Sequence, residues 1–285
     1  MENRVSQFAG AKEAKGNTDK PLVSIITSVL NGSKYLEECL QSVLNQSYPY
    51  IEHILVDGAS TDGTVEMLAS YQAKYPDRIR FISEPDEGTG EAVNKGLRMA
   101  KGAILGGLPA DDFYQPDAVQ KVVEFFRGNT GAYFVYGNYR TINEKGGIMR
   151  HGKPQPFTVK DLINKGSYFA YCSAFYKREV VEKVGYFEPV LGCDREYWIR
   201  VGMVFPMHPI DEVLSNFRVH AGATSSGTSI KTRRKHMRVN YLVTRRYGGS
   251  VFSASCRNYY KFLIIEWLRP MLGFAYPWIK KIGVK

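Results

Sequence analysis

Acidic side chains recur in this sequence directly after short apolar runs. Asp57 ends the run "IEHILVD", Asp86 follows "IRFISEP", and the adjacent pair Asp111 and Asp112 follows "AILGGLPA". If these runs are parallel strands of one sheet, their carboxyl ends meet at one edge, where such folds bind ligands. Carboxylates gathered there repel each other unless a divalent cation or sugar hydroxyls lie between them. The pattern therefore predicts a polar, cation-binding edge.

Each of these acids also has a purely local interpretation. Asp57 and Asp62, within "DGASTDGT", suit a tight turn and the start of a helix, and Asp86 in "EPDEG" suits a turn. Asp112 could cap the helix that follows it, although Asp117 is nearer the start of that helix. Two successive acids after an apolar strand are less common as caps, which favours the binding interpretation for the pair.

The apolar runs alternate with helical patterns. Strands that alternate with helices predict a mostly parallel sheet covered on both faces, so the fold class is α/β. We expect strands near 22–30, 51–58, 79–84, 102–108 and 132–139, with helices near 33–46, 61–75, 90–100 and 115–127. After residue 138 the pattern is mixed. It predicts a hairpin near 140–157, helices near 159–166, 177–185 and 193–205, and a strand near 210–220.

The length of 285 residues suits one large domain with an appendage. Residues 1–20 are polar, so we expect a flexible leader and no secretory signal there. Residues 21–230 form the main domain, with a first half at about 21–138 and a second half at about 139–230. Residues 231–285 form a basic, aromatic helical tail. No segment has the roughly 18 uninterrupted apolar residues of a membrane span.

The positive charge of the chain is concentrated in the tail. The chain has a net charge of +10, yet residues 231–285 carry 13 Lys and Arg against one acid, Glu266, and the rest is close to neutral at −2. Tyr259, Phe262, Leu263 and Trp267 could share one helix face among these basic residues. Such a surface suits an anionic membrane, a nucleic acid, a partner subunit or packing on the main domain. The membrane is slightly favoured, and the near-neutral main domain disfavours nucleic acid.

Several other functions lack their motifs. The first predicted strand–helix turn, "TSVLNGS", has one glycine where a dinucleotide fold has G-x-G-x-x-G, and a P-loop lysine motif is absent. A nucleotidyltransferase, which also uses acids at strand ends, usually has a glycine-rich basic loop there. The cysteines indicate neither a zinc site nor a disulfide framework and fit a reducing cytoplasm; they are Cys39, Cys172, Cys193 and Cys256.

Three segments, taken in order, resemble family 2 glycosyltransferases. They read "VSIITSVLNGSKYLEECLQSVLNQSYPYIEHILVDGASTDGT", "SEPDEGTGEAVNKGLRMAKG" and "LPADD", and the resemblance runs from about Val23 to His220. It implies the GT-A fold, in which a Rossmann-like nucleotide half precedes a mixed acceptor half. It also implies inverting transfer of a sugar from a nucleotide-diphosphate sugar. A non-catalytic sugar-nucleotide binder is an alternative, disfavoured by the presence of all the expected acids.

The resemblance implies roles for individual residues. Thr27, Asp57, Asp86 and Asp111 match positions that bind the nucleotide sugar. Asp112 matches the position that holds Mn²⁺ or Mg²⁺ on the diphosphate. The chemistry agrees, because a hard divalent cation prefers carboxylate and phosphate oxygens and stabilises a leaving diphosphate.

Two further features lie in or near these motifs. The segment "FRVHAGATS" resembles the family's R-x-H-x-x-x-S, so His220 is expected at the metal or the diphosphate, although a lone histidine is often structural. Relatives usually carry Asn or Ser where this chain has Pro109, which lacks an N–H and so loses a hydrogen bond.

The segment "CDREYWIR" is similar to the family's E-D-Y-D-x-W-x-R. Asp194 then takes the place of the catalytic base, Glu196 that of a second acid, and Cys193 that of a glutamate. An inverting transfer needs a carboxylate to accept the proton of the acceptor hydroxyl, and desolvation beside Tyr197 and Trp198 would raise its pKa. Asp194 could instead cap its helix. Whether Glu196 assists stays open.

The resemblance also implies the partners. We expect a UDP-sugar as the donor and a glycan or lipid-linked molecule as the acceptor. The expected location is the cytoplasm, at the inner face of the plasma membrane if the tail binds lipid. The sequence leaves a homo-oligomer open and does not name the sugar.

Overall fold

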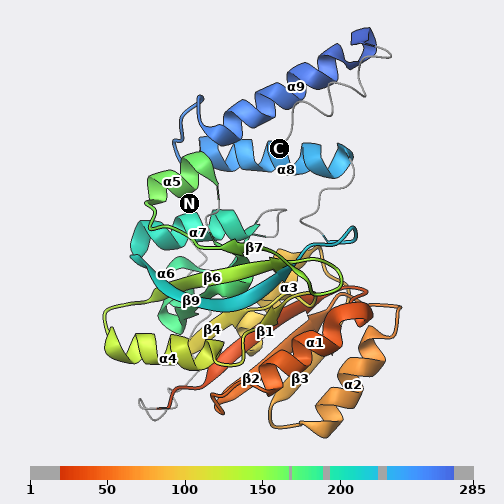
Figure 1. Cartoon of the computed structure of the whole chain (residues 1–285), viewed down its shortest axis with the longest axis vertical. Helices are drawn as coiled ribbons and strands as arrows, with labels where there is room; N and C mark the ends of the chain where they lie inside the picture. Colours follow the sequence, from red (N-terminus) through yellow and green to blue (C-terminus); the bar gives the residue numbers. More distant parts are fainter. Residues whose placement is uncertain (1–19, 167–168, 189–192, 224–229, 273–285) are drawn as a thin grey trace, which may run out of the picture.

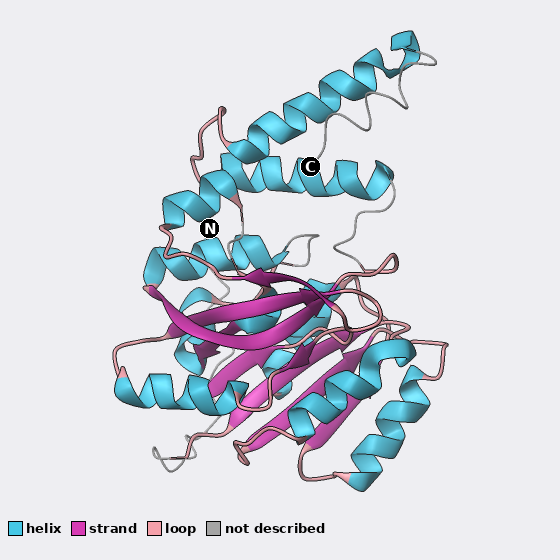
Figure 2. Ribbon diagram, in the orientation of Figure 1, coloured by secondary structure: helices cyan, strands magenta, loops and turns pink. Residues whose placement is uncertain are grey.

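A computed structural model describes residues 20–166, 169–188, 193–223 and 230–272. Its centre is a curled nine-stranded sheet with helices on both faces, which confirms the α/β class (Figure 2). The first four helices alternate with parallel strands, as the sequence pattern predicts. The halves expected to meet near residue 138 share this one sheet, because that residue lies inside strand β6.

The sheet has the strand order β3-β2-β1-β4-β8-β6-β9-β5, and β7 pairs with β6. Strands β1 to β4 are mutually parallel, whereas β8 runs antiparallel to both β4 and β6. The sequence pattern does not predict β8 or the two-residue strand β5. The strands are β1 Val23–Val29, β2 Ile51–Asp57, β3 Ile79–Ser83, β4 Ile104–Gly107, β5 Phe113–Tyr114, β6 Phe134–Ile142, β7 Ile148–Gly152, β8 Ala174–Lys177 and β9 Met207–Arg218.

The helices fall into two layers and a terminal pair (Figure 1). Helices α1, α2 and α4 pack on one face of the sheet, and α3, α6 and α7 pack on the other. Helices α5, α8 and α9 lie together at one end of the molecule. The bounds are α1 Ser33–Leu44, α2 Thr64–Lys74, α3 Thr89–Met99, α4 Ala118–Gly128, α5 Val159–Lys165, α6 Arg178–Val184, α7 Cys193–Val204, α8 Ile230–Arg246 and α9 Ala254–Leu272.

Burial on both faces explains the apolar composition of β1. Ile25 faces α1 and α4 and the neighbouring Ile26 faces α3, since successive side chains of a strand point to opposite faces. A cluster of aromatic rings fills the space between the sheet and α7. Trp198 and Tyr197 on α7 pack there against rings from β6 and β8, including Phe134.

The glycine pair that ends β4 is required by close packing. A Cβ on Gly106 would lie 2.6 Å from the ring of Phe175, and one on Gly107 would lie 2.3 Å from the ring of Tyr171. Both contacts are shorter than side chains tolerate. The glycines therefore let the strand that precedes the acid pair sit against β8 and the turn before it.

The tail forms two helices in the described residues. Helix α9 contacts α8 and α5, and its far end extends beyond the body of the molecule (Figure 1). Across the described part of the chain, every helix is too short or too polar to cross a bilayer.

Candidate functional site

The acids that follow the parallel strands gather at one edge of the sheet. In the register of the sheet, Val29 pairs with Asp57, and Asp57 pairs with Ser83. Strand β4 lies on the other side of β1 in the same direction. The loops after β1, β2, β3 and β4 therefore emerge at the same edge, as the strand pattern predicts.

Asp57 organises the turn that follows β2. Its carboxylate is fully buried and accepts hydrogen bonds from the Ser60 backbone N–H at 2.9 Å and from the Ser83 hydroxyl at 2.7 Å. The Ser60 hydroxyl donates to the second carboxylate oxygen. Ala59 within this turn has a φ of 63°, a left-handed conformation that few side chains adopt. Asp57 thus fixes the shape of the loop.

Asp86 lies against the same turn. A Cβ on Gly58 would lie only 2.9 Å from Oδ2 of Asp86, so the two loops approach each other closely at this point. The other oxygen of Asp86 accepts a hydrogen bond from the Gly88 N–H at 2.7 Å, just before α3. The structure therefore brings together Asp57 and Asp86, which the resemblance assigns to the nucleotide.

A link between the first two loops was not recognised from the sequence. The Asn31 N–H donates to the Ser60 hydroxyl at 2.7 Å, and Oδ1 of Asn31 accepts from the Thr61 N–H at 2.9 Å. Asp62 accepts from both the N–H and the hydroxyl of Ser33. Burial acts to raise the pKa of Asp62, but hydrogen bonds from Thr64 and Ser33 lower it to about 2. The sequence signal for this link was a pair of polar segments, "NGS" at 31–33 and "STDGT" at 60–64, which follow the two neighbouring strands β1 and β2.

Thr27 lies below this edge with its side chain inside the fold. Its hydroxyl is fully buried and lies 2.8 Å from Nε2 of His53, on the side of the sheet that faces Cys39 of α1. Burial lowers the pKa of His53 to about 3, so this imidazole is neutral at ordinary pH. The Thr27 hydroxyl is thus already engaged, and a contribution of this segment to ligand binding would come from the loop that follows it.

Asp111 forms a partly exposed pair with His220. Nε2 of His220 lies 3.0 Å from Oδ2 of Asp111, and the two side chains remain 15% and 29% exposed. The imidazole also packs on the ring of Tyr35, with 4.9 Å between the centroids. Residues 109 positions apart thus meet at the end of β4, and both present polar atoms to the outside.

Asp112 is the buried member of the acid pair. Its side chain is 1% exposed, one carboxyl oxygen accepts from the Arg218 N–H at 2.8 Å, and the other oxygen has no hydrogen-bond partner. Burial, and next the charge of Asp111, raise the pKa of Asp112 well above its usual range. The two neighbours therefore differ in environment: Asp111 faces outward and Asp112 faces the interior.

Arg218 holds the loop that carries this pair. Its Nε donates to the backbone oxygen of Asp111 at 3.0 Å, and its Nη2 donates to the carboxylate of Glu38 on α1. The guanidinium lies over the ring of Tyr35, 4.6 Å from its centroid, and is almost fully buried. These contacts make Arg218 a support for the edge rather than an accessible cation.

Asp194 is the second residue of α7 and is half-buried. Burial raises its pKa, while the Arg195 N–H and the nearby positive groups of Arg195 and His236 oppose that rise. His236 comes from α8, so the tail contributes to the surroundings of Asp194. Cys193 lies outside the residues whose side chains are described.

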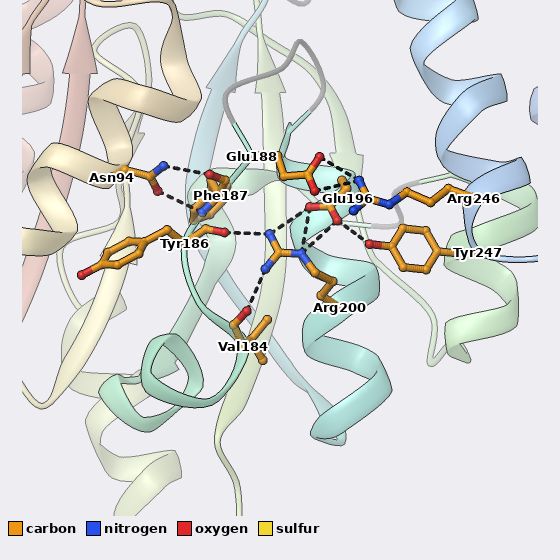
Figure 3. Close-up of polar contacts among 9 residues, drawn as sticks. All are labelled: Asn94, Val184, Tyr186, Phe187, Glu188, Glu196, Arg200, Arg246 and Tyr247. Atoms are coloured by element: carbon orange, nitrogen blue, oxygen red, sulfur yellow. Dashed lines mark hydrogen bonds and ion pairs between the residues drawn. The ribbon is translucent and has the colours of Figure 1, made fainter. Parts of the chain in front are cut away.

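Glu196 is a buried residue of α7 whose carboxylate is bonded to Arg200 and Tyr247 (Figure 3). It is 1% exposed and accepts hydrogen bonds from Arg200, whose Nε lies 2.9 and 3.0 Å from the two carboxylate oxygens. The Tyr247 hydroxyl, just after α8, donates to the same carboxylate. Arg200 in turn donates to the backbone oxygens of Val184 and Tyr186. All the oxygen atoms of Glu196 are engaged in holding α7.

The donor chemistry at the edge fits a divalent cation. Asp111 offers a carboxylate and His220 an imidazole nitrogen within the same few ångströms. Within the described residues, three or more His, Cys, Asp or Glu side chains do not converge as a ready-made metal cage. Such a cation is often held by one or two protein ligands and completed by substrate phosphates and water. The arrangement is therefore suited to a cation that arrives with a phosphorylated ligand.

Comparison with known proteins agrees with this geometry. Residues 24–185 match the family described as "Glycosyl transferase family 2". Chondroitin synthase of Escherichia coli is 30% identical over 247 residues, which cover 84% of this chain and 36% of that protein. An uncharacterized glycosyltransferase of Rickettsia felis is 31% identical over 70% of this chain and 35% of that protein. This chain thus spans about a third of the length of these relatives.

Solved structures share the fold. TarS 1-349 of S. aureus in complex with UDP-GlcNAc has a TM-score of 0.62 at 16% identity, over 93% of this chain and 76% of that one. The mannosyltransferase PcManGT of Pyrobaculum calidifontis, in complex with GDP-Man and Mn²⁺, has a TM-score of 0.62 at 22% identity, over 93% and 77%. These likenesses confirm the GT-A fold. Together with the match over more than half of the sequence, they show that the chain belongs to glycosyl transferase family 2.

Proposed function

We propose that this protein transfers a sugar, with inversion, from a nucleotide-diphosphate sugar to a hydroxyl of a glycan or lipid-linked acceptor. The observation that carries the proposal is the partly exposed pair of Asp111 and His220 at the same edge of the sheet as the loops of Asp57 and Asp86. It supplies ligands for a cation next to a preformed turn. Asp194 at the start of α7 supplies a separate carboxylate with a raised pKa.

The nucleoside would lie on the loops after β2 and β3. Their shape is fixed by hydrogen bonds of Asp57 and by the close approach of Asp86 to Gly58. Fixed loops reduce the entropy that a ligand must lose on ordering its site. Asp86 has one oxygen engaged by Gly88 and lies close to the outside of the turn, which suits a contact with the nucleoside.

We assign the metal to Asp111 and His220 rather than to Asp112. The carboxyl of Asp112 is buried and one of its oxygens is bonded to the Arg218 N–H, so Asp112 is the less accessible of the two acids. Asp111 and His220 are accessible and adjacent. A bound Mn²⁺ or Mg²⁺ would neutralise charge on the departing diphosphate. Asp112 supports the loop from inside.

Asp194 acts as the base in this proposal. The acceptor oxygen forms its bond to the anomeric carbon while the bond from that carbon to the diphosphate oxygen breaks. The proton of the acceptor hydroxyl passes to a carboxylate oxygen of Asp194. A base of raised pKa holds this proton better than an ordinary aspartate near neutral pH.

The donor is proposed to be a UDP-sugar. Similar proteins support this choice, since one solved structure of the same fold contains UDP-GlcNAc and one relative is a chondroitin synthase. Another solved structure of the same fold contains GDP-Man. Binding of a GDP-sugar in preference to a UDP-sugar would therefore correct this proposal.

We also propose that the tail docks on an anionic membrane surface at the cytoplasmic face. Tyr260, Leu263, Ile264 and Trp267 form one exposed stripe on α9, and Trp267 is 67% exposed. Their spacing of three and four residues is that of a helix that lies in a membrane interface. Thirteen basic residues in the tail match the charge of anionic lipid. Flotation with phosphatidylglycerol vesicles should carry the intact protein upward and fail for Ile264→Ser with Trp267→Ser; an intact protein that stays below overturns the docking.

A panel of nucleotide sugars with Mn²⁺ or Mg²⁺ tests the catalytic proposal. We expect Asp111→Asn to weaken cation-dependent donor binding, and Asp194→Asn to keep donor binding and lose transfer. Asp211→Asn, which changes an exposed carboxylate paired with Lys153, is the matched control. Transfer by Asp194→Asn at the unmodified rate would remove Asp194 as the base. Cation-dependent donor binding without transfer to any acceptor would favour a non-catalytic binder.

A further inference from the structure

We propose that Arg195 is a positioning residue that fastens the first turn of α7, and with it Asp194, to α5 and to the tail helix α8. In this arrangement α8 is part of the catalytic unit and not an appendage. The proposal rests on the proposed function, in which Asp194 is the base.

The side chain of Arg195 is buried at a point where three helices meet. From the C-terminal turn of α5, Leu162 offers its backbone oxygen at 3.1 Å and Ile163 at 2.7 Å. From α8, Asn240 offers its backbone oxygen at 3.0 Å, and Thr244 its hydroxyl oxygen at 2.9 Å. Arg195 is only 4% exposed, so these bonds replace water for its donors.

All of these acceptors are uncharged, so the contacts of Arg195 are hydrogen bonds to neutral groups and not an ion pair. The last carbonyls of a helix have no partner within the helix and carry partial negative charge. Leu162 and Ile163 belong to that part of α5, so the guanidinium caps α5 while it reaches α8. Five fixed donors on one planar group suit a joint between elements.

Thr244 strengthens the same joint from the tail side. Its side chain is fully buried, and its hydroxyl lies within hydrogen-bond distance of the backbone oxygens of both Ile163 and Asn240. A second tie between α7 and the tail is the bond from Tyr247 to Glu196 (Figure 3). Two buried residues that are adjacent on α7 thus both contact the tail, and they lie in the same first turn as Asp194.

The charge of Arg195 also acts on its neighbour. Burial raises the pKa of Asp194, and the positive groups of Arg195 and of His236 on α8 oppose the rise. The charge of Lys235, the neighbour of His236 on α8, acts to lower the pKa of His236, and Cys256 of α9 acts to raise the pKa of Arg195. Removal of the Arg195 charge should therefore raise the pKa of Asp194 further. A purely structural contact would not move this quantity.

The test compares Arg195→Lys, Arg195→Met and Thr244→Val with the unmodified protein. We expect Arg195→Met to lower kcat about 100-fold, as for a misplaced catalytic group, with the donor KM unchanged. The acidic limb of its kcat–pH profile should move to higher pH. Arg195→Lys keeps the positive charge, so the acidic limb of its kcat–pH profile should stay at the same pH although kcat falls. Thr244→Val, which is nearly isosteric, should lower kcat without changing the donor KM.

The controls separate this proposal from the one on which it rests. Arg200→Met removes another buried arginine of α7, bonded to Glu196, and should lower stability without moving the acidic limb. If Arg195→Met does not fold, Arg195→Lys and Thr244→Val decide, and unchanged kcat in both overturns the proposal. An unmoved limb in a folded Arg195→Met also overturns it. Transfer by Asp194→Asn would instead refute the proposed base, whatever the Arg195 variants do.

Discussion

The buried carboxylate of Glu196 offers a direct test of how α7 is held. Glu196→Gln keeps the shape of the side chain and removes its charge. In the folded protein that charge receives three hydrogen bonds from Arg200, at 2.9 to 3.0 Å, and one from the Tyr247 hydroxyl. Burial, and next the bond to Glu196, raise the pKa of Tyr247 to about 12, so the phenol is a donor at neutral pH. An amide in place of the carboxylate would present N–H groups to some of these donors.

The expected cost follows from the surroundings of the pair. Loss of one partner of a fully buried ion pair costs about 3–5 kcal/mol. Arg200 remains 21% exposed and keeps its bonds to two backbone oxygens, so part of its charge stays solvated. We therefore expect a loss of about 2–3 kcal/mol in the free energy of unfolding. At about 2–4 °C per kcal/mol for a chain of this size, the Tm should fall by about 4–12 °C.

Thermal unfolding and the transfer rate should be measured on the same preparations. Below its Tm, Glu196→Gln should lower kcat only slightly, because Arg195 still fastens the first turn of α7 to α5 and α8. Glu188→Gln is the matched control: it removes an exposed carboxylate paired with Arg246 in the same region, and such a pair contributes about 0–1 kcal/mol. An unchanged Tm together with a lost kcat in Glu196→Gln would refute this reasoning and place Glu196 in the chemistry.

Three further changes test the packing of the fold. Gly107→Ala should lower the free energy of unfolding by about 1–3 kcal/mol, since its Cβ would lie 2.3 Å from Tyr171, whereas Gly128→Ala meets no atom within 4 Å and should not destabilise; urea unfolding compares them. Burial lowers the pKa of His53 to about 3, so the unmodified protein should lose stability relative to His53→Gln as the pH falls below about 6.5, by up to ~1.4 kcal/mol per pH unit. A constant difference between pH 7 and 4.5 would contradict a neutral buried imidazole. Asn94→Ala removes two buried hydrogen bonds, at 2.8 and 2.9 Å, and should cost about 1–3 kcal/mol in the same urea assay.

The sequence predicted the features that depend on local pattern. Alternating strand and helix patterns located the parallel strands and their helices, because burial on both faces of a sheet leaves continuous apolar runs. The same logic placed Asp57 and Asp86 at one edge. Strand parity could also have located Thr27, which shares a face with Ile25 and therefore points toward α1.

Features that depend on distant partners were beyond this pattern. Strand β8 has only four residues and is defined by its neighbours β4 and β6. Likewise, Arg195 has partners on α5 and α8, and Glu196 has one just after α8, and nothing in the spacing of "CDREYWIR" indicates those contacts. Only the pair of Glu196 with Arg200, four residues apart, follows from that spacing. These contacts depend on which helices pack against α7 in the folded protein.

The acid pair after β4 shows how two adjacent carboxyls can coexist at the end of a strand. If both were charged and buried, their repulsion would be large, because a low dielectric screens it poorly. Asp112 instead turns inward, where burial raises its pKa and favours the uncharged form, while the Arg218 N–H holds it in place. Asp111 then carries the accessible charge beside His220. The fold thus gives the two adjacent acids different surroundings, with Asp111 partly exposed beside His220 and Asp112 in the interior.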